Sequence, residues 1–114
     1  MIKITSKGFK GNGVYIGRNK YGNVFGNPFP VKRSKFSEKV YSLRESLELY
    51  RKYFEEKVIK SREFKELVER YKTEGYLELD CWCINKTVRN IEDVDLNNCM
   101  CHGEIIAYYI LKEC

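Results

Sequence analysis

Residues 76–83 read Tyr-Leu-Glu-Leu-Asp-Cys-Trp-Cys, and this alternating stretch decides the fold. Successive side chains of a β-strand point to opposite faces of the sheet, so the alternation predicts a strand with one apolar face. That face carries Leu77, Leu79, Cys81 and Cys83. The opposite face carries Tyr76, Glu78, Asp80 and Trp82.

Two amphipathic helices are predicted before this strand and one after it. Ser42 and Glu45 form a capping-box signature, and apolar residues follow at helical spacing, which predicts a helix over 42–59. The same spacing predicts a helix over 62–73. A third helix is expected to begin at 102 or 103 and to run to 113.

Two further strands are expected near the N-terminus. Residues 2–5 and 13–17 have strand composition, and Gly11-Asn12-Gly13 between them is a hairpin signal. Residues 84–100 are polar and acidic and are interpreted as an excursion loop. This order of elements predicts an α/β domain with a sheet of three or four strands covered by three helices.

Length and composition fit one domain over residues 1–114. We divide it into a basic strand and loop region, 1–41, the two helices of 42–73, and the strand, acidic loop and helix of 76–114. No apolar run reaches the roughly 20 residues of a membrane span, and the first residues lack the apolar core of a signal peptide. We therefore expect a cytoplasmic location.

The formal net charge of +5 is unevenly placed. Residues 1–35 hold eight basic side chains and no acid, and the remainder holds 13 bases and 16 acids, so the two parts carry +8 and −3. A basic region of this kind indicates an anionic partner. The eight bases are Lys3, Lys7, Lys10, Arg18, Lys20, Lys32, Arg33 and Lys35.

All five cysteines lie in the last third of the chain, and four of them form two close pairs. An odd count without a signal peptide argues against a secreted disulfide framework. A zinc site is one interpretation, although zinc pairs more often enclose two to four residues than the single residue here. The other interpretation places Cys81 and Cys83 as small apolar side chains on the buried face of a strand. The candidate zinc ligands are Cys81, Cys83, Cys99, Cys101 and His102.

Other residues could bind an anionic ligand directly. Arg18 follows a predicted strand and could clamp a phosphate, or it could be a solvated surface charge. Asn27, held by Pro28, could offer its amide to a ligand or stabilise a turn. Trp82 could stack on a ring or pack against a helix. The candidate ligand-binding set is Tyr15, Arg18, Asn27, Trp82, Cys83, Cys101, His102 and Gly103.

Cys101 and His102 stand at the start of the third predicted helix. Backbone N–H groups at a helix N-terminus favour anions and lower the pKa of a thiol, so Cys101 could bind an anion, attack a nucleotide-like substrate, or cap the helix with a packed thiol. Because no separate base is evident in the sequence, binding is favoured over catalysis.

Several motifs occur together in the order of a known family. They are Val14-Tyr15-Ile16-Gly17-Arg18, Gly26-Asn27-Pro28-Phe29, Tyr50-Arg51, Leu79-Asp80-Cys81-Trp82-Cys83 and Cys101-His102-Gly103-Glu104-Ile105-Ile106. The chain resembles the uncharacterised bacterial and phage family called domain of unknown function four-three-two-six. The resemblance implies a Rossmann-like α/β fold and a shared site, with no established reaction. The phage members suggest a role in phage–host conflict, such as capture of a host signalling nucleotide.

Three hypotheses follow from these observations. The first is a phosphate-bearing, nucleotide-like ligand bound by the Gly-Asn loop, Arg18 and the Cys101-His102-Gly103 helix start. The second is zinc held by the cysteine and histidine cluster. The third is a nucleic acid bound by the basic N-terminal third. Its stacking side chains would be Tyr15, Tyr21, Phe25 and Phe29.

Overall fold

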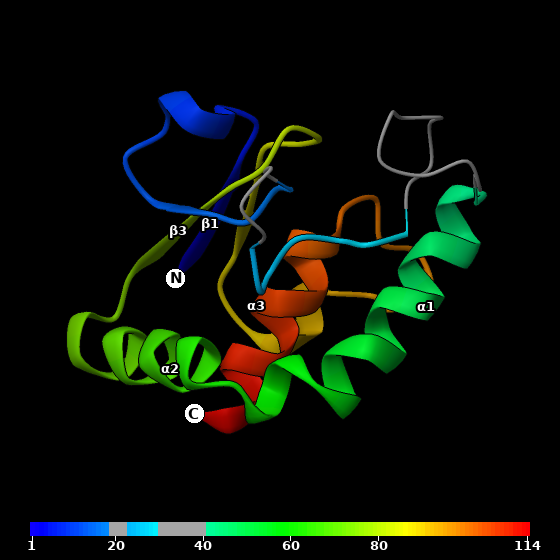
Figure 1. The fold of residues 1–114 in the computed structure, drawn as a ribbon. Helices are drawn as coiled ribbons and strands as arrows, with labels where there is room; N and C mark the ends of the chain where they lie inside the picture. The colour runs from blue at the N-terminus through cyan, green and yellow to red at the C-terminus, as the bar shows by residue number, and fades with distance from the viewer. Residues whose placement is uncertain (19–22, 30–40) are drawn as a thin grey trace.

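The computed structural model describes residues 1–18, 23–29 and 41–114 (Figure 1). Its described part has one four-stranded sheet and three α-helices, which confirms the predicted α/β class. The strands are β1 (Ile2–Thr5), β2 (Val14–Tyr15), β3 (Leu77–Asp80) and β4 (Lys86–Val88). The α-helices are α1 (Leu43–Glu56), α2 (Arg62–Glu74) and α3 (His102–Glu113). Short 3-10 helices span Gly8–Lys10, Val58–Lys60 and Ile91–Asp93.

The strands lie in the order β2-β3-β1-β4. β3 pairs in parallel with β1 on one side and with β2 on the other, and β4 is antiparallel to β1. The predicted hairpin is therefore wrong, because β1 and β2 do not pair with each other. Residues 6–13 are held to β3 instead, since the backbone N–H of Gly8 donates to the carbonyl of Cys81 at 2.8 Å and that of Gly13 to the Asp80 carboxylate at 2.7 Å.

The predicted excursion loop contains β4, so that prediction is wrong for residues 86–88. Val88 is fully buried opposite Ile2, whereas Lys86 is half-buried and Thr87 is exposed. This edge strand has three residues, and only Val88 is buried in the sheet. Because its other two residues are polar, the sequence pattern did not indicate a strand.

The three helices lie on one side of the sheet: α2 and α3 contact its strands, and α1 packs against α3 (Figure 1). Alternate strand residues supply that face, and their side chains are almost completely buried with the apolar faces of the helices. Ile2, Ile4, Leu77 and Leu79 form the sheet side of this core. On the opposite face, Lys3 and Thr87 are exposed and Glu78 between β1 and β2 is half-buried, so this face is open to solvent there.

The helix boundaries follow the predicted capping chemistry. The Ser42 and Glu45 capping box opens α1, which ends at Glu56, three residues before its predicted end, where the chain passes into a 3-10 turn. α2 ends at Gly75, whose φ of 69° is the left-handed conformation expected of a glycine cap. Among the described helices, none is long and apolar enough to cross a lipid bilayer.

Candidate functional site

The carboxyl ends of the three parallel strands lie at one edge of the sheet. β1 is followed by residues 6–8, β2 by 16–18 and β3 by 81–83, and α3 begins beside them, since the ring Nε2 of His102 lies 2.7 Å from the carbonyl oxygen of Ile16. In open α/β sheets this is the edge where ligands bind. Most of the predicted site residues therefore lie at this edge, on one side or the other of it, whereas Asn27 and Cys99 lie elsewhere.

Three thiols meet on the helix-covered side of this edge. The sulfur atoms of Cys81, Cys83 and Cys101, which we call the thiol trio, lie within 4.8 Å of one another. The Sγ atoms of Cys81 and Cys101 are 3.1 Å apart, and those of Cys81 and Cys83 are 3.7 Å apart. Cys81 and Cys101 are buried and Cys83 is exposed, so the expectation that both cysteines of the first pair lie on a buried strand face is wrong for Cys83.

The three thiols of the trio shift one another's pKa. Hydrogen bonds from the thiols of Cys101 and Cys81 hold the pKa of Cys83 well below the usual thiol range. The pKa of the Cys101 thiol is raised, mainly by its contact with Cys81 and then by its contact with Cys83. Of the three thiols, Cys83 therefore loses its proton most readily, and it is also the exposed one.

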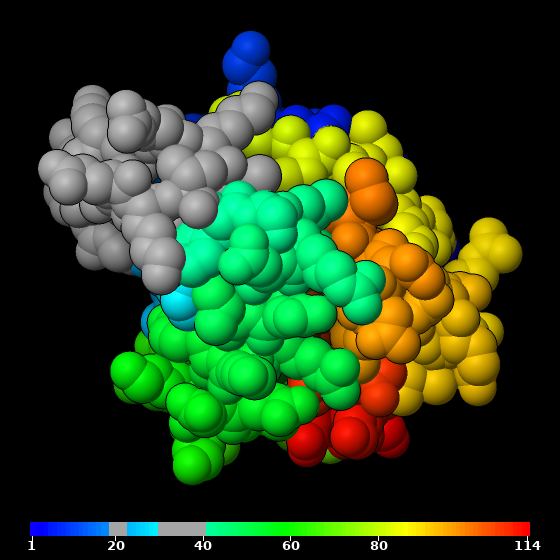
Figure 2. Space-filling model, turned by 90° about the vertical axis from the view of Figure 1, so that its right-hand side faces the viewer, coloured from blue at the N-terminus to red at the C-terminus, as the bar shows by residue number. Residues whose placement is uncertain are grey.

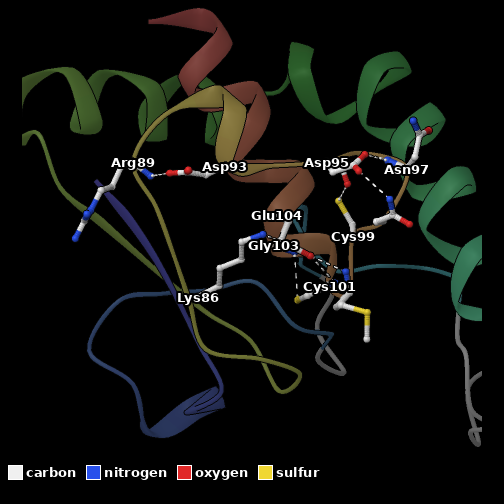
Figure 3. Close-up of polar contacts among 11 residues, drawn as sticks. Lys86, Arg89, Asp93, Asp95, Asn97, Cys99, Cys101, Gly103 and Glu104 are labelled. Carbon is white, nitrogen blue, oxygen red and sulfur yellow. Dashed lines mark hydrogen bonds and ion pairs between the residues drawn. The ribbon is translucent and has the colours of Figure 1, made fainter.

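The first turn of α3 fixes the position of Cys101. The backbone N–H of Gly103 donates to the Cys101 sulfur at 3.4 Å, so the thiol caps the helix as one of the sequence interpretations held. The buried carboxylate of Glu104 accepts from the backbone N–H groups of Met100 and Cys101, and its other oxygen lies 2.6 Å from Nζ of Lys86 (Figure 3). The sequence showed the cap at α1 but not this buried carboxylate and its lysine.

Cys99 and His102 were candidate zinc ligands, and the structure does not bring them into the thiol trio. The Cys99 thiol points to the carbonyl oxygen of Asp95, 3.2 Å away, and burial raises its pKa to about 12 (Figure 3). Burial lowers the pKa of His102, whose ring is held by the carbonyl of Ile16. Although both residues are close to Cys101 in the sequence, neither side chain therefore lies in the thiol trio.

The start of α3 is closed to an incoming anion. The N–H groups of Gly103 and Glu104 already bond Cys101, and Cys101, His102, Gly103 and Glu104 are all buried. A Cβ atom at Gly103 would lie 3.0 Å from Ile16 and 3.2 Å from Ile4, so this glycine lets the helix approach the sheet.

Three aromatic rings gather on the open side of the same edge. Phe9, Tyr15 and Trp82, which we call the aromatic patch, are in mutual contact, with Phe9 and Tyr15 ring centroids 4.1 Å apart. The indole N–H of Trp82 donates to the Tyr15 hydroxyl, which in turn donates to the carbonyl of Arg18. Trp82 is 55% exposed and packs against Gly8 and Phe9 of the short 3-10 helix, not against one of the three α-helices.

Sequence reasoning missed two residues of this side. Phe9 is 65% exposed and lies between Lys7 and Lys10 in the sequence, a signal that a basic and aromatic cluster was present. Asp80 is almost fully buried, and its carboxylate accepts from the Thr5 hydroxyl at 2.6 Å and from the Gly13 N–H at 2.7 Å. This carboxylate holds the loop that carries the aromatic patch.

The remaining predicted residues separate into exposed and structural ones. The Arg18 side chain is exposed at the end of β2. The Asn27 side chain bonds the Ser46 hydroxyl and the Phe29 N–H, which supports the turn interpretation over the ligand one. Of the proposed stacking side chains, Phe25 is buried, Phe29 packs against Tyr53, and Tyr21 lies outside the described residues.

A separate groove lies between α1 and residues 96–100, on the face shown in Figure 2. Its volume is about 540 Å³ and its walls carry Leu43, Leu47, Cys99 and Met100 together with charged residues of α1. Of the residues predicted to form the site, Cys99 alone contributes to it. The groove is therefore distinct from the carboxyl edge of the sheet.

The comparisons with known proteins agree with the sequence resemblance. No curated protein and no solved structure matches the chain significantly. A family model matches residues 3–112, which include the thiol trio and the aromatic patch. The chain belongs to the family described as Domain of unknown function (DUF4326).

Proposed function

We propose that the thiol trio binds a thiophilic metal ion, with zinc as the expected ion. The observation that carries this proposal is the convergence of three thiols within 4.8 Å from two separate segments, the end of β3 and the start of α3. Thiolate sulfur is a preferred ligand of zinc, and the low pKa of the Cys83 thiol supports metal binding near neutral pH.

The spacing of the sulfur atoms supports this donor set. Two thiolates on a tetrahedral zinc ion are about 3.8 Å apart, from a Zn–S bond of about 2.3 Å. The 3.7 Å between Cys81 and Cys83 agrees with this value, whereas the 3.1 Å between Cys81 and Cys101 would have to open by a fraction of an ångström.

The expected coordination is three cysteines and one open position. Among the described residues, no fourth Cys, His, Asp or Glu joins the thiol trio. A zinc ion with three protein ligands polarises whatever molecule occupies its fourth position. Cys83 is exposed, so that position would be reachable from the carboxyl edge of the sheet.

Metal binding is tested on the reduced protein by elemental analysis and by cobalt substitution. We expect about one zinc per chain and, with cobalt, the sulfur-to-metal charge-transfer absorption of thiolate ligands. Cys83→Ser should weaken both signals, and Cys114→Ser, which changes an exposed cysteine outside the thiol trio, should leave them unchanged. Less than about one-fifth of an equivalent of zinc together with no thiolate absorption would exclude the site.

A second candidate function is the binding of a phosphate-bearing, nucleotide-like molecule at the same edge. The observation that favours it is the exposed Arg18 at the carboxyl end of β2, in a region that carries eight bases and no acid. A guanidinium in this place can pair with a phosphate through two hydrogen bonds. The closed start of α3 leaves Arg18 as its main phosphate contact.

This second candidate is tested by thermal stabilisation with a panel of nucleotides. A ligand that binds the folded protein raises the melting temperature, and Arg18→Ala should abolish the shift. Lys3→Ala is the matched control, because Lys3 is an exposed base in the middle of β1, away from its carboxyl end. If no nucleotide stabilises the wild-type protein, this function is excluded while metal binding is unaffected.

A further inference from the structure

The aromatic patch is exposed and yet held in a fixed arrangement. Phe9 is 65% and Trp82 55% exposed, which is unusual for rings of this size in a small domain. Gly8 has a φ of 57°, and a Cβ atom there would lie 2.2 Å from the Trp82 ring, so the indole rests directly on the backbone. The indole N–H bond to the Tyr15 hydroxyl fixes its orientation. Rings that are already ordered lose little conformational entropy on binding.

The charged side chains on the segments that carry Phe9 and Tyr15 are all basic. Lys7, Lys10 and Arg18 are exposed on the segments that carry Phe9 and Tyr15. Two acids lie on this face of β3: Asp80 is buried and already bonded to Thr5 and Gly13, and the half-buried Glu78 accepts from the Tyr76 hydroxyl. The surface therefore combines exposed aromatic faces with positive charge, a combination that complements stacked bases joined by phosphates.

The ring orientations favour a strand over a single nucleotide. The planes of Phe9 and Trp82 are 73° apart, with centroids separated by 5.6 Å, so their faces offer stacking positions in different directions. One base cannot stack on both rings at once, whereas successive bases of a flexible strand can. We propose that the aromatic patch binds single-stranded nucleic acid, with bases stacking on Phe9 and Trp82 and phosphates contacting Lys7, Lys10 and Arg18.

This surface is separate from the proposed metal site. Trp82 lies on the open side of the sheet edge and the buried thiols Cys81 and Cys101 lie on the helix-covered side. Strand binding should therefore persist in the presence of a metal chelator. If the thiol trio binds no metal, the proposal of strand binding still stands. If the aromatic patch binds no strand, the proposal of metal binding still stands.

The chain provides its own reporter, because Trp82 is the single tryptophan. We expect a thymidine oligonucleotide of about eight nucleotides to quench Trp82 fluorescence at low salt. With three basic contacts, the logarithm of the binding constant should fall with the logarithm of the salt concentration with a slope of about −2. Absence of quenching by the oligonucleotide at low salt would overturn the proposal.

Two variants with matched controls locate the contact. Phe9→Ala should weaken binding by roughly fivefold or more, while Tyr76→Ala, an exposed aromatic at the other end of β3, should not. Lys10→Ala should reduce the steepness of the salt dependence by about 0.7. Lys60→Ala should leave the salt dependence unchanged. It is the matched control, because Lys60, like Lys10, ends a 3-10 helix of three residues.

Two further outcomes would contradict the proposal. If thymidine monophosphate quenches Trp82 at the same concentration as the oligonucleotide, the surface recognises a single nucleotide. If the protein self-associates through Phe9 in sedimentation experiments and does not bind the oligonucleotide, the patch is an interface between copies of the chain. The proposal of strand binding is supported if the oligonucleotide quenches Trp82, the monophosphate does not, and Phe9→Ala reduces the quenching.

Discussion

The two sides of the sheet's carboxyl edge differ in what they expose. On the helix-covered side, Cys81 and Cys101 are 1% exposed, so Cys83 is the thiol of the trio that solvent reaches. On the open side, Phe9 and Trp82 present more than half of their surface to solvent. One tripeptide, Cys81-Trp82-Cys83, directly follows β3 and contributes to both sides, because Trp82 contacts the rings while Cys81 and Cys83 lie in the thiol trio.

The comparison shows that the two sides are held by different interactions. The thiol trio is positioned by burial of α3 against the sheet and by the buried Glu104 carboxylate at its first turn. The aromatic patch is positioned by the Asp80 carboxylate beneath its loop and by the close contact of Gly8 with Trp82. Each support can be removed separately, and the expected losses of stability differ in size.

The largest expected effect comes from Asp80→Ala on the open side. The substitution leaves the Thr5 hydroxyl and the Gly13 N–H without their partner in a buried place, which should lower the free energy of unfolding by about 3–5 kcal/mol. Urea denaturation measures this loss, and the emission of Trp82 should shift to the red because the segment of Gly8 and Phe9 that packs against the indole is released.

Glu78→Ala is the matched control for that loss. Glu78 is on the same strand and the same face, is half-buried, and has one carboxylate oxygen without a hydrogen bond in the described structure. We expect its removal to change stability by less than about 1 kcal/mol. Equal losses for the two variants would show that burial of the strand, and not the Asp80 hydrogen bonds, holds the loop.

A smaller effect is expected from Gly8→Ala, which tests the contact under Trp82. Gly8 and Gly75 both have positive φ, but a Cβ atom at Gly8 meets the Trp82 ring whereas one at Gly75 meets nothing within 4 Å. The left-handed backbone alone should cost about 1 kcal/mol at Gly75, and the added clash should raise the cost at Gly8 to about 2–3 kcal/mol. If the two losses are the same in thermal unfolding, Trp82 is not held by the backbone.

Local patterns in the sequence predicted much of this arrangement. The alternation of residues 76–83 identified β3, although the paired strand ends at Asp80, and the capping residues and apolar spacing identified the three helices. These features depend on residues a few positions apart, so they can be read without knowing the rest of the fold. The family resemblance was confirmed by the match over residues 3–112.

Long-range partners could not be predicted in the same way. The pairing of β3 with both β1 and β2 joins residues more than 60 positions apart, and the local Asn-Gly signal favoured a hairpin instead. Cys81 and Cys101 meet because α3 packs on β1, the neighbour of β3, whereas Cys99, two residues earlier, turns to Asp95. The role of Asp80 depends on a loop that returns across the sheet, and its own sequence neighbourhood gives no sign of this.

The smallest effect is expected on the helix-covered side, from Glu104→Gln at the start of α3. This change keeps the size of the side chain but removes the negative charge that accepts two backbone N–H groups and pairs with Lys86 at 2.6 Å. The site is buried, so we expect a loss of about 1–2 kcal/mol in urea denaturation.

Glu45→Gln makes the same change in the capping box of α1, where the contacts are exposed, and should cost only about 0.3 kcal/mol. The difference between the two variants measures how much burial strengthens the same local motif. A difference near zero would mean that the position of Cys101 is fixed by the packing of α3 against β1 and β3 alone. A clear difference would mean that a charge inside the helix-covered side helps to place the thiols, as Asp80 places the rings on the open side.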